Sequence, residues 1–119
     1  MDTGTRAITA AVIRVIHKNH MIDKIQDRSA GKTYSITGTL SPTAIDIYDH
    51  TRGCHVNGSI HGHDISLHDH KTTKRLTLTL SGGSFHGYDS GSSKGFSGSV
   101  TDSSVSIYDN EDGKHHLYS

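Results

Sequence analysis

The chain has 119 residues, with twelve basic and twelve acidic side chains, and only 31% of its residues are hydrophobic. This length suits a single domain, residues 1–119, and the low apolar fraction predicts a thin core such as a sheet with one apolar face makes. Proteins that bind nucleic acid normally carry a basic excess, so nucleic acid is not an expected partner.

A cytoplasmic location is the expectation from the cysteine content and the N-terminal sequence. Cys54 is the single cysteine, so the chain cannot form an internal disulfide and nothing indicates an oxidising compartment. The apolar stretch 7–16 is interrupted by Arg14 and fits neither a signal peptide nor a membrane span. We therefore expect neither a signal peptide nor a transmembrane segment.

Residues 5–28 show the spacing of a helix with one buried face, which makes residues 1–31 an N-terminal helical segment. Thr5 is the predicted N-cap, and Gly31 is suited to the left-handed conformation that ends a helix. The many β-branched residues leave a strand over residues 10–16 as the alternative. The apolar positions are Ile8, Ala11, Val12, Val15, Ile16, Ile22 and Ile25.

Residues 32–119 contain a repeat with a period of 20. Within each unit, two runs of alternating apolar and polar residues flank a short turn, which is typical of a β-hairpin. The sequence therefore predicts an antiparallel β-meander of four hairpin units. The marker dipeptides of the repeat are Tyr48-Asp49, His68-Asp69, Tyr88-Asp89 and Tyr108-Asp109.

A register follows from the requirement that facing residues of antiparallel strands share one side of the sheet. In every unit, one apolar pair lies next to the turn and one pair of a glycine with a large residue lies beyond it, as volume conservation in a core predicts. The apolar pairs are Leu40 with Ile45, Ile60 with Ile65, Leu80 with Phe85 and Val100 with Val105. The glycine pairs are Gly38 with Ile47, Gly58 with Leu67, Leu78 with Gly87 and Gly98 with Ile107.

This pattern predicts a mainly β fold of eight or nine strands, in which a curled sheet or barrel packs its apolar face on the N-terminal helix. A flat sheet that pairs with a second copy in a homodimer is the second possibility. A β-solenoid with coils of 20 residues is the third, although the short turns suit hairpins better.

Eleven histidines are an unusual number for this length, and nine of them lie in the repeat region. The register predicts that His50, His55 and His70 line up on three successive strands, with His68 in the neighbouring row. Adjacent imidazoles could bind Zn²⁺, Ni²⁺ or Cu²⁺, or titrate together near neutral pH. In the alternative interpretation they are ordinary surface residues, since His68 stands where other units carry tyrosine.

A second outward row of alternating rings and small polar groups is a candidate ligand face. Planar rings beside hydroxyls and amides suit a polar, ring-shaped ligand such as a sugar, or a protein surface. Cross-strand packing of the tyrosines explains the same pattern without a ligand. The residues singled out as the ligand face are Tyr48, Asn57, His68, Tyr88 and Tyr108.

These observations favour a non-catalytic binding or structural module that uses its polar His/Tyr/Ser/Thr face. A metal-binding protein with a surface histidine cluster is the alternative. An enzyme is the least favoured class, because repetition spreads similar residues over a face, whereas catalysis needs dissimilar groups that converge. The aspartates at positions 49, 69, 89 and 109 each begin a turn, so we interpret them as turn caps.

Overall fold

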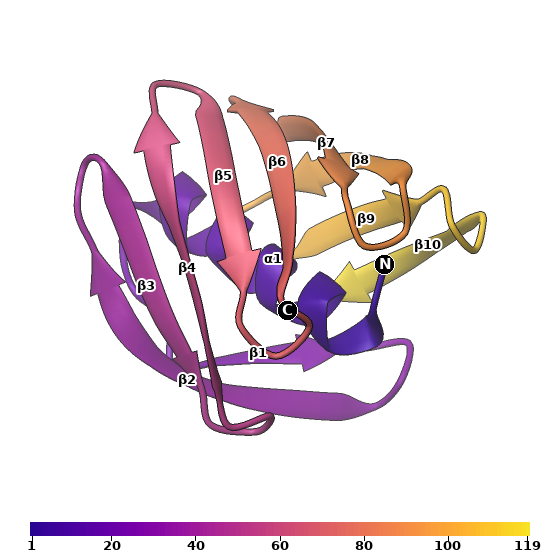
Figure 1. The fold of residues 1–119 in the computed structure, drawn as a ribbon, viewed down its shortest axis with the longest axis horizontal. Coiled ribbons are helices and arrows are strands. Elements are labelled where there is room, and N and C mark those ends of the chain that lie inside the picture. Colours follow the sequence, from indigo (N-terminus) through magenta and orange to yellow (C-terminus); the bar gives the residue numbers. More distant parts are fainter.

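The computed structural model describes residues 1–119, in which one helix and ten strands form a closed antiparallel barrel (Figure 1). Each strand from β2 to β10 pairs with its neighbours in sequence, and β1 closes the barrel between β10 and β2. The predicted meander wrapped over an N-terminal helix is confirmed, with ten strands rather than eight or nine. The elements are α1 (Thr3–Lys18), β1 (Lys24–Asp27), β2 (Lys32–Leu40), β3 (Ala44–Asp49), β4 (Cys54–His61), β5 (Asp64–Asp69), β6 (Lys74–Ser81), β7 (Ser84–Asp89), β8 (Lys94–Val100), β9 (Val105–Asp109) and β10 (Lys114–Tyr118).

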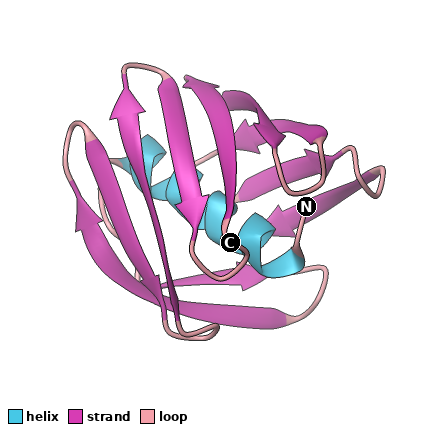
Figure 2. Cartoon of the chain, viewed as in Figure 1, coloured by secondary structure: helices cyan, strands magenta, loops and turns pink.

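The helix α1 lies inside the ring of strands, as Figure 2 shows. Every residue from Gly4 to Ile13 is buried, so the helix contacts the barrel wall on all sides and not along one stripe. A helix that is apolar nearly all round is stable only in such an enclosed position. α1 lacks the length and apolar character that a membrane-spanning helix requires.

The ends of α1 differ from the prediction. Asp2 caps the helix by accepting a hydrogen bond from the Thr5 backbone N–H at 3.1 Å, so the N-cap predicted at Thr5 is wrong. The helix stops at Asn19, whose left-handed conformation (φ 53°) ends it nine residues before Arg28. Ile25 matched the helical spacing, but it is an inward residue of β1 that pairs with Tyr34. The alternative strand over residues 10–16 is also wrong.

The eight predicted facing pairs are all confirmed. A Cβ atom added to Gly98 would lie 1.8 Å from the Ser106 carbonyl oxygen and 2.8 Å from Cζ of Phe85. The glycines therefore serve a close approach of neighbouring strands as well as making room for a large side chain. The large apolar residues of these pairs are all buried, except Leu40, which is partly buried.

The register across the remaining turns differs by two residues from a simple stacking of the repeat. Tyr48 faces His55, His68 faces Arg75 and Tyr88 faces Gly95. A sheet can close into a barrel only when its strands tilt and their register is staggered. Residues 20 apart in the sequence are therefore displaced along the barrel and do not form the straight outward row that the sequence predicted.

Candidate functional site

Five buried aspartates mark one end of the barrel, which we call the sealed end. One aspartate stands before each of the five turns at this end, and its carboxylate accepts hydrogen bonds from backbone N–H groups of that turn. The turn-capping role predicted for the four aspartates of the repeat is confirmed, and Asp27 has the same role. None of the five is more than 4% exposed, which the sequence analysis did not anticipate; they are Asp27, Asp49, Asp69, Asp89 and Asp109.

Two arginines, the buried Arg6 and the mostly buried Arg52, neutralise part of this acidic ring. Arg52 bonds Asp49 through Nε at 2.6 Å and Asp69 through Nη1 at 3.0 Å. Arg6, from α1, bonds Asp109 at 2.9 Å and the Tyr118 hydroxyl at 2.8 Å. The start of α1 is thus fixed to the barrel wall by an ion pair, and we interpret this cluster of charged residues as structural.

The environment of Asp69 illustrates the balance at the sealed end. Burial alone would raise the pKa of its carboxyl group, but the hydrogen bond from the Thr5 hydroxyl (2.6 Å) and the charge and hydrogen bond of Arg52 outweigh it. The pKa of Asp69 is consequently lowered. A sequence signal for this role did exist, since each aspartate falls on the inward parity of its strand, two residues after an inward position such as Leu67.

Tyr48 lies between two of the predicted metal ligands on the outer face. Its ring centroid is 4.8 Å from that of His50 and 4.8 Å from that of His55. Nε2 of His50 is 2.8 Å from the Thr37 hydroxyl. The predicted position of His50 opposite His55 is therefore wrong, because the stagger puts Tyr48 there instead.

The other histidine pair is tighter. The ring centroids of His68 and His70 are 4.3 Å apart, and His70 lies 3.3 Å from Oδ1 of Asn57. His70 donates its backbone N–H to the His55 carbonyl, as expected for facing strands. No group of three or more His, Cys, Asp or Glu side chains is placed to hold one metal ion. Metal binding by these histidines stays a prediction.

A cleft of about 460 Å³ crosses the outer face of β5, β6 and β7, and we call it the polar groove. Its lining combines short polar side chains with the rings of His61, His86 and Tyr88. In one row Ser66 faces Thr77, which faces Tyr88. The groove arises from this difference in side-chain length, and its polar and ring-bearing residues are His61, Asp64, Ser66, Thr77, Thr79, His86 and Tyr88.

Tyr88 and Asp64 give the polar groove its chemical character. Tyr88 is 50% exposed, the largest value among the large hydrophobic residues. The Asp64 carboxylate accepts a hydrogen bond from the Thr79 hydroxyl at 2.8 Å. A flat ring next to an oriented carboxylate and hydroxyls can stack on one face of a ligand and hydrogen-bond its edge.

A second cleft of about 400 Å³ adjoins the polar groove over β3 to β6, and Ser66 lines both. Asp46, Asn57 and His68 form one row along its side, because the register pairs them in succession. Of the predicted ligand face, Asn57 and His68 line this second cleft, and Tyr88 lines the polar groove. Tyr48 and Tyr108 line neither cleft, and Tyr108 packs on His115 with ring centroids 4.8 Å apart.

Comparison with known proteins finds no relative of this chain. The chain matches no protein-family model, no curated protein and no solved structure.

Proposed function

We propose that the protein is a non-catalytic binding module and that its polar groove takes a polar, ring-shaped ligand such as a sugar. The observation that carries this proposal is the half-exposed Tyr88 in a groove that hydroxyl side chains also line. An aromatic ring that is exposed to water contributes little to the stability of the fold, whereas stacking on a ligand would bury its apolar surface.

The arrangement of polar groups supports binding over catalysis. Ser66, Thr77 and Thr79 present hydroxyls from adjacent strands, and these can donate to and accept from the hydroxyls of a sugar. Asp64 is already engaged by Thr79 and is thereby held in one orientation. Such groups can form hydrogen bonds with the edge of a ligand. Nucleophilic catalysis needs a nucleophile hydrogen-bonded to a base, which a third group orients.

The test is a titration with a panel of mono- and disaccharides, followed by two-dimensional NMR of the backbone amides. The expected result is that one sugar class shifts the amides of β5, β6 and β7, and that Tyr88→Ala weakens its binding by about tenfold or more.

Tyr108→Ala is the matched control, since Tyr108 occupies the same position of the repeat outside both clefts. It should bind like the wild type. Equal losses in both variants, or no shift with any sugar, would contradict the proposal. Because Tyr88 is half exposed, its variant should remain folded.

Metal binding is the second candidate function, and the 4.3 Å spacing of the His68 and His70 rings favours it. Two imidazoles at this distance can supply two ligands to Zn²⁺, Ni²⁺ or Cu²⁺. Zn²⁺ titration of the wild type and a His68→Ala/His70→Ala variant tests this candidate. Stoichiometric binding that the variant loses would support it, and equal weak binding would exclude it.

We also propose a cytoplasmic location. It is supported by the single thiol, Cys54, which is buried and, having a burial-raised pKa, is poorly suited to form a disulfide. Fractionation of cells followed by immunodetection of the protein would test the proposal, which predicts the protein in the soluble cytoplasmic fraction.

A further inference from the structure

The wall of the barrel is incomplete at the end opposite the acidic ring, which we call the open end. β2 is nine residues long, but its partner β1 has only four and faces β2 from Ser35 to Lys32. One more hydrogen bond joins the two segments, from the Ile36 N–H to the Asp23 carbonyl at 2.9 Å. Beyond it, the remainder of β2 pairs with β3 alone.

The alternation of an antiparallel ladder fixes which backbone groups this leaves unpaired. Ser35 and Ser41 make the hydrogen bonds toward β3, so residues of that parity, Thr37 and Thr39 included, point to β3. Gly38 and Leu40 have the opposite parity and direct their N–H and C=O groups to the missing part of β1. No hydrogen bond within the chain reaches them from that side. The open end therefore presents a short free strand edge.

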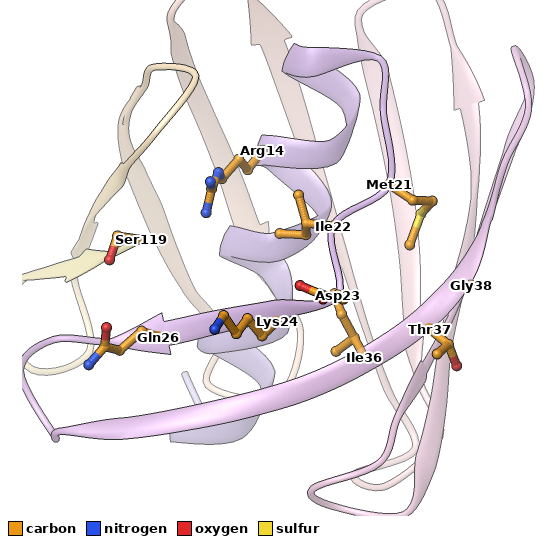
Figure 3. Close-up of a pocket in the computed structure, with 10 residues that line it drawn as sticks. All are labelled: Arg14, Met21, Ile22, Asp23, Lys24, Gln26, Ile36, Thr37, Gly38 and Ser119. Carbon is orange, nitrogen blue, oxygen red and sulfur yellow. The ribbon is translucent and has the colours of Figure 1, made fainter.

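A cleft of about 760 Å³, the largest in the molecule, lies beside this edge. Figure 3 shows Met21 between β2 and the segment 19–23 that links α1 to β1, and Ile22 on the other side of that segment. Four apolar residues at this end are only partly buried, in the last turn of α1, in segment 19–23 and at the end of β2; they are Ile16, Met21, Ile22 and Leu40. The edge is thus bordered by an apolar surface.

Two cationic side chains line the same cleft without a carboxylate partner. Arg14 donates Nε to the Asp102 backbone carbonyl at 3.2 Å, and neither Arg14 nor Lys24 forms an ion pair. Asp23 is the one acidic residue of the lining. A ligand carrying a carboxylate would complement this surface, and the complementarity would act mainly on association and specificity.

We propose that the open end captures an extended peptide segment that carries at least one acidic residue, by adding it as a short strand to the free edge of β2. The main-chain groups of Gly38 and Leu40 supply the ladder bonds. Alternate side chains of the peptide meet the apolar surface around Met21, and a carboxylate reaches Arg14 or Lys24. A small amphipathic anion would use the cations and the apolar surface, but it would leave the edge unpaired.

The experiment uses a fluorescein-labelled, end-blocked peptide of alternating valine and glutamate as the probe. Anisotropy measures binding, and two-dimensional NMR with hydrogen exchange follows single amides. We expect the peptide to bind, and we expect the Gly38 and Leu40 amides to become protected while those of β6 and β7 do not change. Arg14→Gln and Lys24→Gln should each weaken binding about fivefold or more, and Lys71→Gln, an exposed change at the sealed end, should have no effect.

Two further probes separate a strand from a simpler ligand. Two versions of this peptide are N-methylated at every second backbone amide, one at the odd and one at the even positions. Binding should be lost in the version whose methylated amides face β2. Equal binding of the two methylated versions, or equal binding of a peptide of alternating valine and lysine, would overturn the proposal.

Binding that octanoate competes away without protection of Gly38 would assign the cleft to small amphipathic anions. Protection of Gly38 that rises with protein concentration alone would assign the edge to a second copy. Each of these two results overturns the proposal, and neither bears on the polar groove, which lies on other strands.

Discussion

The two ends of the barrel are closed by different means. At the sealed end, aspartates turn inward from five turns, Arg6 of α1 bonds Asp109, and Arg52 links Asp49 to Asp69. At the open end, a short β1 leaves part of β2 without a partner on one side, and apolar side chains such as Met21 stay partly exposed. One end is held by directional ionic contacts, and the other by partial apolar cover.

This difference separates where the barrel is held together from where it can bind. Buried ion pairs are costly to break, because removal of one partner leaves an uncompensated charge away from water. A free strand edge has backbone N–H and C=O groups without a hydrogen-bond partner in the chain, and natural sheets normally cover such edges. We therefore expect substitutions at the sealed end to act on stability, and those at the open end to act on binding.

Arginine substitutions should give the largest contrast. Arg52→Met strips Asp49 and Asp69 of their counter-charge and should lower the free energy of unfolding by about 3–5 kcal/mol. Arg14→Met, at the open end, should change it by less than about 0.5 kcal/mol. Urea denaturation followed by circular dichroism measures both. Similar losses in the two variants would mean that the ends do not differ in this way.

Truncation of apolar side chains sharpens the same contrast with a smaller effect. Ile8→Ala removes a fully buried side chain from the enclosed helix and should cost about 3 kcal/mol through lost burial and a cavity. Met21→Ala removes a partly exposed side chain and should cost about 1 kcal/mol or less. Thermal unfolding measures the two shifts. A larger loss for Met21→Ala would show that the open end is better packed than described.

Acid should weaken the sealed end first. Asp69 has a pKa below the ordinary value of 3.8, so its contribution to stability is present above pH 3.8 and is lost as the pH falls through its lowered pKa. Asp69→Asn should therefore make unfolding less dependent on pH below 3.8 than in the wild type. Urea titrations at a series of acidic pH values measure the dependence. An unchanged slope in the variant would rule out Asp69 as a source of it.

The sequence determined the hairpins well because glycine and large residues exchange places within a fixed volume. Gly58 with Leu67 and Leu78 with Gly87 could be paired from the pattern alone, and the structure has both. The inward parity of the strands then gave the core. Tertiary contacts overrode the pattern at Ile25, whose helical spacing also fits a strand and whose pairing partner, Tyr34, lies on β2.

The candidate sites were harder to predict, since they depend on the stagger between strands. A register shift of two residues puts Tyr48 opposite His55, so the rings do not form the predicted straight row. Tyr88 lines the polar groove, whereas Tyr108 lies outside it. No local pattern reports the shear of a barrel. Likewise, the length of β1 decides whether β2 has a free edge, and strand ends are the part of a sequence pattern that is least defined.

Hydrogen exchange of four neighbouring amides of β2 in the free protein tests the contrast between the two ends most directly. Thr37 and Thr39 direct their N–H groups to β3 and should be protected, while Gly38 and Leu40 face the gap and should exchange rapidly. This alternation, residue by residue, is the predicted result. Equal protection of all four amides would show that the barrel wall is complete at the open end, and that β2 has no free edge there.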